Sequence, residues 1–233
     1  MRLIFKFIVL FFSCLCISAS VNAQGNVKFS VFGGAGFSFY NVKYDFNVKG
    51  IDTSYKSNNR FSFEAGLSAR YDFAKFAGIR GEAQFIRKGG SIAANRIYGQ
   101  DITAVTRNYV TYLDYIQISL LPQLNFHTNV NSMFYFTTGG YASFNIGANE
   151  TVTETTTLQI RTYDKDISNS IKKTDAGIVV GGGFESVNTS QHGVTIDLRF
   201  CIGLVNSFND NFAGDRLKMK NYSLNINLGY VFF

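Results

Sequence analysis

The sequence predicts an all-β protein, namely an eight-stranded antiparallel up-and-down transmembrane β-barrel with long extracellular loops and short periplasmic turns. Apolar and polar residues alternate along eight segments, long and short connections alternate between those segments, and the chain begins with a stretch typical of export. Alternation with a period of two gives a strand one apolar and one polar face. Because backbone groups find no water inside a bilayer, only helices and closed barrels cross it.

The N-terminal residues 1–23 have the layout of a secretory signal peptide. A positively charged start is followed by an apolar stretch over residues 7–17 and by a small-residue cleavage site that ends at Ala23. The apolar stretch is shorter than the roughly 20 residues of a membrane-spanning helix, which disfavours an anchor. A lipoprotein signal at Cys14 is disfavoured by the two phenylalanines that stand before it. We expect residues 24–233 to form one barrel domain in the outer membrane.

Eight segments carry the alternation. They are residues 27–40, 61–73, 76–89, 109–126, 133–147, 174–187, 193–205 and 221–233. The second segment is the clearest, since Phe61 and every second residue as far as Phe73 are apolar and the residues between them are small or polar. The fourth segment is the least regular, and we expect Pro122 to mark its end because proline lacks the N–H that a sheet needs.

The connections between these segments alternate in length. The long polar ones are residues 41–60, 90–108, 148–173 and 206–220, and the short ones are residues 74–75, 127–132 and 188–192. Outer-membrane barrels have short periplasmic turns and longer extracellular loops. The pattern therefore supports the count of eight strands and places both termini on the periplasmic side.

The composition suits a sheet with aromatic girdles at the membrane interfaces. The chain has 24 phenylalanines, 13 tyrosines and 22 glycines, but one proline and no tryptophan. Without Arg2 and Lys6 the chain holds 20 basic and 16 acidic residues, and no run of like charges stands out. Nucleic-acid binding is therefore not expected.

The polar faces of the segments carry charges of both signs. These residues are Lys28, Glu64, Arg70, Asp72, Arg80, Glu82, Asp175, Glu185, Asp197 and Arg199. The interior of an eight-stranded barrel is just wide enough to be filled by side chains, and buried charges must be paired. We expect a salt-bridged structural plug. A narrow polar path or a gated lumen remains the alternative.

The residues do not point to catalysis, to a metal or to a cofactor. The two histidines, His127 and His192, fall in expected periplasmic turns, so a base is missing at the outer rim. Cys201 is the one cysteine of the mature chain, and we expect it to be a small strand residue. The glycine runs at residues 33–36 and 181–183 lack the Lys-Ser/Thr of a phosphate loop and are expected where strands coil or a large neighbour needs room.

The connection at residues 149–173 is rich in threonine and keeps a period of two. Such a sequence can extend the barrel strands above the membrane. It then offers either an edge for a partner or a solvated hairpin, and exposed loops on a rigid scaffold are common binding sites.

Several stretches together resemble one protein family. They are residues 81–90 (GEAQFIRKGG), 113–122 (LDYIQISLLP), 139–142 (GGYA), 175–185 (DAGIVVGGGFE), 197–200 (DLRF) and 228–233 (LGYVFF). They resemble the outer-membrane β-barrel domain proteins of Bacteroidetes, which include the PorT-like and porin family proteins. The resemblance implies an eight-stranded barrel without enzymatic activity or cofactor. It also implies insertion by the barrel-assembly machinery through the C-terminal aromatic residues, here Tyr230, Phe232 and Phe233.

The sequence thus predicts an integral outer-membrane barrel with a charge-plugged lumen. Its expected role is structural or interactive, through extracellular loops that contact the environment or an unidentified extracellular or envelope protein. The alternatives are a narrow passive transport porin and a component of a type IX secretion or gliding system. A soluble periplasmic barrel for a small apolar ligand is disfavoured, because the charges fall on the narrower polar face of the strands.

Overall fold

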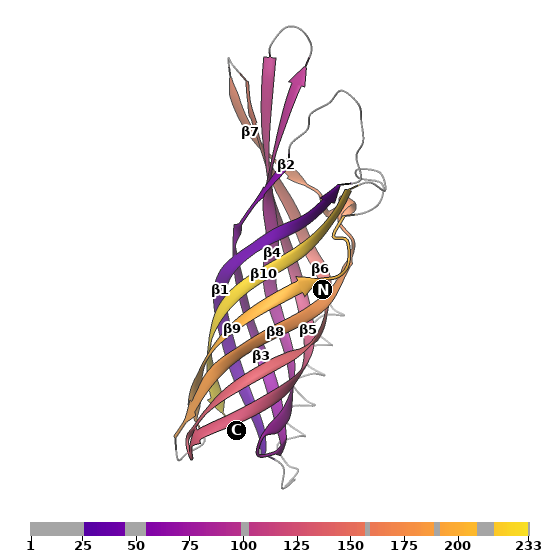
Figure 1. The fold of residues 1–233 in the computed structure, drawn as a ribbon. Helices are drawn as coiled ribbons and strands as arrows, with labels where there is room; N and C mark the ends of the chain where they lie inside the picture. Colours follow the sequence, from indigo (N-terminus) through magenta and orange to yellow (C-terminus); the bar gives the residue numbers. More distant parts are fainter. Residues whose placement is uncertain are drawn as a thin grey trace, which may run out of the picture.

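The chain forms a closed antiparallel barrel in the computed structural model, which describes residues 26–44, 55–98, 103–156, 159–188, 192–208 and 217–232 (Figure 1). The ring strands are β1 (Asn26–Tyr44), β3 (Arg60–Ala74), β4 (Ala77–Tyr98), β5 (Thr103–Asn129), β6 (Ser132–Thr155), β8 (Thr174–Val187), β9 (Gly193–Gly203) and β10 (Leu217–Phe232). Each pairs with its neighbours along the chain, and β10 closes the ring on β1. The predicted fold class is confirmed. None of the described residues belongs to a helix long and apolar enough to cross a membrane.

The two faces predicted for each strand are present in the barrel. On β3, Phe61 and Phe73 are 62% and 61% exposed on the outside, whereas Ser62 and Glu64 are buried on the inside. The other ring strands follow the same rule, with phenylalanine, leucine and isoleucine facing outward. An apolar outer surface is what a barrel needs in contact with lipid.

The apolar outer face ends at a charged cluster on its extracellular side. Arg87 of β4 and Asp114 of β5 are opposite each other and form an outward-facing ion pair, with 2.6 Å between Nε and Oδ1. The guanidinium of Arg60 lies over the ring of Tyr112 and donates a hydrogen bond to its hydroxyl on the same side. Since charges are costly against hydrocarbon, this cluster marks the level at which the strands leave the membrane.

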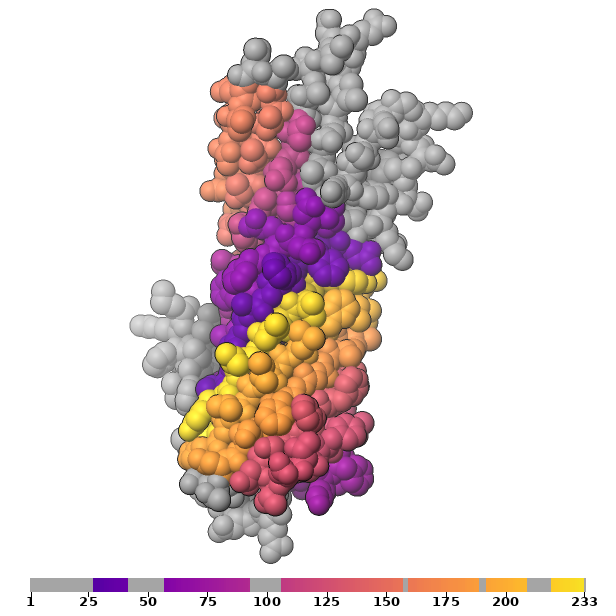
Figure 2. Space-filling view, turned by 60° about the vertical axis from the view of Figure 1, so that its left-hand side comes forward, coloured from indigo at the N-terminus to yellow at the C-terminus, as the bar shows by residue number. Residues whose placement is uncertain are grey.

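Three ring strands continue far beyond this level. The pairing of β4 with β5 extends to Tyr98 opposite Thr103, and β6 pairs with β5 as far as Thr155. Two short strands join them, since β2 (Tyr55–Asn58) pairs with β4 and β7 (Ile160–Asp166) pairs with β6. The result is an extracellular sheet of β2, β4, β5, β6 and β7 that stands above the barrel (Figures 1 and 2). The expected loops at residues 90–108 and 148–173 are therefore partly strand, because the ladder hydrogen bonds continue outside the membrane.

The expectation for Pro122 was wrong, because this residue lies well inside β5. On the β4 side, Pro122 is opposite Ile79 within an unbroken register. On the β6 side, the pairing is interrupted between Leu120 and Gln123, and the Thr137 hydroxyl donates a 3.0 Å hydrogen bond to the Pro122 carbonyl. The Thr137 side chain thus satisfies the Pro122 carbonyl where the ladder between β5 and β6 is interrupted.

Candidate functional site

The periplasmic end of the lumen holds an ion-pair cluster centred on Glu185 of β8. Arg70 of β3 makes a bidentate contact with this carboxylate at 2.5 and 2.8 Å, and Lys28 of β1 lies 3.1 Å from it. Arg70 also contacts Asp72, with 3.1 Å between Nε and Oδ2. Glu185 is 1% exposed, so its two cations are what make its burial tolerable.

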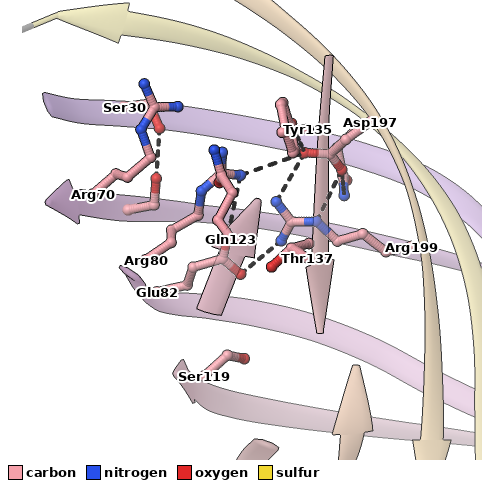
Figure 3. A network of polar contacts seen from close by, with 12 residues as sticks. Ser30, Arg70, Arg80, Glu82, Ser119, Gln123, Tyr135, Thr137, Asp197 and Arg199 are labelled. Carbon is pink, nitrogen blue, oxygen red and sulfur yellow. Dashed lines mark hydrogen bonds and ion pairs between the residues drawn. The ribbon is translucent and has the colours of Figure 1, made fainter. Parts of the chain in front are cut away.

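A second cluster lies in the middle of the lumen around Arg199 of β9 (Figure 3). Its guanidinium donates to Asp197 at 2.8 and 2.9 Å and to Glu82 of β4 at 2.7 Å. The Tyr135 hydroxyl of β6, a strand separated from β9 only by β8, donates a 2.9 Å hydrogen bond to Asp197. Strands that are distant in sequence are thereby joined across the barrel.

Arg80 lies between these two clusters and is held less tightly than the other buried arginines. Its guanidinium is 3.8 Å from Glu82 and 3.9 Å from Asp197, and it lies over the ring of Tyr135 at 4.7 Å (Figure 3). Its Nε is buried without a hydrogen-bond partner. Beside it is a cavity of about 10 Å³, room for one water molecule, that is also lined by Lys28 and Glu185.

Glu64 of β3 differs from the other lumen carboxylates, because amides rather than cations hold it. Asn225 and Asn227 of β10 donate hydrogen bonds to its two oxygens at 2.8 and 2.6 Å. With Glu64, the ten charges predicted to share the interior all lie on the lumen side, and nine of them take part in ion pairs.

One lumen cation, Lys88 of β4, was not predicted from the sequence. Its ammonium is buried, lies 3.5 Å from Asp175, donates to Gln117 at 2.9 Å and lies 4.1 Å from the centre of the Tyr141 ring. The sequence does indicate this position, because Lys88 is an even number of residues from Arg80 and Glu82 and therefore shares their face of the strand. The predicted segment ended at residue 89, one residue after Lys88, because the two glycines at residues 89 and 90 interrupt the alternation of apolar and polar residues.

An apolar cluster begins at the level of Lys88 and continues toward the extracellular end of the lumen, and it was not predicted from the sequence. Side chains from five strands meet there with residues of two connections, and the cluster comprises Tyr40, Ile86, Leu113, Tyr115, Ala148, Ile167, Ile171, Phe208 and Met219. The connections are tied down by backbone hydrogen bonds: Ile167 N–H donates to Ala148, Lys172 N–H to Ser207, and Ser207 N–H to Met219. We call this group the apolar cap, and it closes the extracellular end of the lumen.

The remaining candidate groups do not form a reactive centre. Cys201 is buried beside Leu121, Tyr141 and Val179. His127 was expected in a turn but lies on β5, because that strand runs to Asn129; His192 precedes β9, and its ring stacks on Tyr230. Within the described residues, no group of three His, Cys, Asp or Glu side chains could hold a metal ion.

A closed ring of eight antiparallel strands, apolar outside and polar inside, defines the class of outer-membrane β-barrels. The family of outer membrane protein β-barrel domains matches residues 22–209. The chain therefore belongs to this family, whose members lie in the outer membrane. No curated protein matches the chain.

Solved structures of several small outer-membrane barrels are similar in fold. OprG from Pseudomonas aeruginosa is 16% identical with a TM-score of 0.43, and the match covers 91% of this chain and 99% of OprG. Neisserial surface protein A is 12% identical with a TM-score of 0.39, covering 88% and 97%. Ail of Yersinia pestis, in complex with the heparin analogue sucrose octasulfate, is 16% identical with a TM-score of 0.33, covering 90% and 100%.

Proposed function

We propose that this protein is a surface interaction barrel of the outer membrane, in which the lumen charges are structural and the extracellular sheet makes the functional contacts. The observation that carries this proposal is the pairing of a filled lumen with a sheet that projects beyond the membrane. An ion-paired interior under an apolar cap gives stiffness rather than a path for solutes. The protein has no enzymatic activity and no cofactor in this proposal.

The filled lumen supports a structural role at both ends. Paired carboxylates and guanidinium groups occupy the periplasmic and middle parts of the lumen. The contacts of 2.5 and 2.8 Å between Arg70 and Glu185 leave no room for a hydrated ion between these two side chains. At the extracellular end, Ile167, Ile171 and Phe208 pack against the strands. An ion crossing the barrel would have to break buried ion pairs and then enter an apolar layer, and both steps are costly.

Single-channel recording in a planar bilayer tests this proposal. The purified protein should produce no conductance steps, and the Arg199→Ala variant should remain silent because the apolar cap is intact. A porin that conducts ions should be recorded in the same bilayers as a positive control. Reproducible steps from the unaltered protein that change on Arg199 substitution would contradict the proposal.

Transport through a narrow path is the second candidate. It is supported by the weak hold on Arg80, whose nearest carboxylate oxygens are 3.8 and 3.9 Å away, and by the cavity beside it. In this alternative Arg80 would swing between the two clusters, and the recordings described above decide between the two candidates. A role in type IX secretion or gliding rests on the family resemblance alone, and co-purification with other envelope proteins would support it.

The proposal includes a route by which the protein is exported and assembled in the outer membrane. Residues 1–23 act as the signal peptide, and the barrel-assembly machinery inserts the chain through its C-terminal aromatic residues. Tyr230 and Phe232 support this, because both lie on the outward face of β10 with their rings 6.4 Å apart. Phe233 and the signal peptide lie outside the described residues.

A further inference from the structure

The extracellular sheet ends at β2 on one side and at β7 on the other, and the longer of these two strands, β7, has an edge without a strand neighbour. Among the described residues, β7 pairs with β6 alone, and all seven of its residues are exposed. In this respect β7 differs from the eight ring strands, which are paired on both sides. Unpaired strand edges present rows of N–H and C=O groups that can add another strand.

The register shows which backbone groups face this edge. Thr156 N–H donates to Gln159 at one end of the hairpin, and Ile167 N–H donates to Ala148 at the other. Hydrogen-bonded and non-hydrogen-bonded pairs alternate along an antiparallel ladder. The pairs between those two ends therefore place the backbone groups of Ile160, Thr162, Asp164 and Asp166 away from β6.

The two faces of β7 carry opposite charges. Arg161, Tyr163 and Lys165 lie on one face, and Thr162, Asp164 and Asp166 lie on the other. No ion pair within 4 Å joins these four charged side chains to another residue of the described ranges. Two hydrogen bonds reach the carboxylates: Thr151 donates to Asp164 at 2.6 Å, and the Ser168 N–H donates to Asp166 at 2.8 Å. A strand added at this edge would set its own side chains directly opposite these charges.

Charge complementarity identifies the occupant that fits. An added strand needs acidic residues on the face of Arg161 and Lys165 and basic residues on the face of Asp164 and Asp166. A second copy of this chain does not meet that condition in antiparallel pairing, because like faces meet; pairing centred on Tyr163 would set Arg161 against Lys165.

We propose that the free edge of β7 binds an extended segment of a partner protein in which acidic and basic residues alternate, and that the segment is added to the extracellular sheet as a strand. This inference rests on the proposed interaction role and specifies its site and its partner. Backbone hydrogen bonds supply the attachment, and the alternating charges select the segment and its register.

A binding measurement with a designed probe tests the inference on the full-length protein in detergent micelles. The probe is a fluorescent ten-residue peptide of alternating glutamate and lysine, and the control peptide has the same composition in two blocks. Fluorescence anisotropy at moderate salt should show binding of the alternating peptide that is at least tenfold tighter than that of the block peptide. Equal binding of the two peptides would overturn the inference, since it would indicate non-specific attraction.

A matched pair of variants at Thr162 distinguishes the contribution of its backbone N–H to peptide binding from that of its side chain. Thr162→Pro removes one N–H from the free edge and leaves the ladder to β6 in place, since the backbone of this residue faces outward. It should weaken peptide binding at least tenfold, whereas Thr162→Val keeps the N–H and should bind as the unaltered protein does. Unchanged binding by a folded Thr162→Pro variant would contradict strand addition.

A second variant covers the case in which proline prevents folding. Replacing Arg161 and Lys165 with glutamate makes both faces of β7 acidic, so the alternating peptide should lose its advantage over the block peptide. Concentration-dependent dimerisation of the protein alone, abolished by Thr162→Pro, would replace the partner by a second copy. Channel activity in the bilayer would refute the proposed function whatever the peptide does, whereas a silent bilayer without peptide binding would refute this inference alone.

Discussion

At the scale of single residues, the lumen shows that charge in this barrel is arranged in groups rather than in isolated pairs. Glu185 accepts from both Arg70 and Lys28, and Arg199 donates to both Asp197 and Glu82. Each carboxylate or guanidinium therefore depends on partners from several strands. Such sharing makes the removal of a central member costly and the removal of a peripheral one mild.

Replacing the central carboxylate of the periplasmic cluster should destabilise the barrel strongly. Glu185→Gln leaves buried Arg70 and partly buried Lys28 without their shared negative charge. We expect a loss of about 3 kcal/mol in the free energy of unfolding, the lower end for a broken buried pair because Lys28 reaches solvent. Urea titration of the protein in lipid vesicles measures this value. The control is Asp72→Asn, which should cost about 1 kcal/mol, and equal losses in the two variants would show that Glu185 is not central.

Replacing either of two glycines of β1, Gly33 and Gly36, with alanine should have very different effects on the stability of the barrel. A Cβ on Gly36 would lie 1.9 Å from the Leu224 carbonyl oxygen, whereas a Cβ on Gly33 meets its nearest atom at 3.7 Å. Gly36→Ala therefore forces β10 to move and should cost about 1–3 kcal/mol, while Gly33→Ala should change stability by less than about 0.5 kcal/mol. The temperature at which the gel mobility shifts on heating compares the two variants. A similar shift temperature for both would contradict this account of the glycines.

At the scale of elements, different parts of the long connection at residues 148–173 lie in different environments. The distal part of the β6–β7 hairpin stands in solvent, and all residues of β7 are exposed. The segment that follows returns to the barrel, where Ile167 and Ile171 join the apolar cap. A deletion in this connection that is meant to leave the barrel folded should therefore stop before Ile167.

Shortening the β6–β7 hairpin should leave the barrel intact. Glu150 and Lys165 are opposite each other in a hydrogen-bonded position, so an Asn-Gly turn can join them in place of residues 151–164. We expect the same heat-induced gel shift as for the unaltered protein and the loss of the β7 edge. The matched control removes residues 148–173 and with them three members of the apolar cap, Ala148, Ile167 and Ile171. Failure of the shorter deletion to fold would show that β7 supports the barrel.

At the scale of the whole molecule, the barrel is polar and ion-paired for most of its interior and apolar at its extracellular end. This order places the least hydrated layer where the lumen would otherwise open to the outside. The same strands that enclose the lumen carry the extracellular sheet, so the sheet is fixed rigidly to the barrel wall. A rigid scaffold with a projecting edge is a suitable platform for contacts with another protein.

The alternation in the sequence was enough to predict the number of ring strands and the face of each strand that meets lipid, and it placed ten charged residues, though not Lys88, on the polar faces. These features are local, because period-two alternation and turn spacing are written into consecutive residues. The tertiary structure decided which charges meet: Arg70 and Glu185 are 115 residues apart, and their contact depends on the stagger of strands around the ring. The apolar cap from two connections, the continuous β5 through Pro122 and the free edge of β7 also follow from the tertiary structure. Each of these depends on which neighbour a strand or connection packs against, and no local pattern of residues specifies that neighbour.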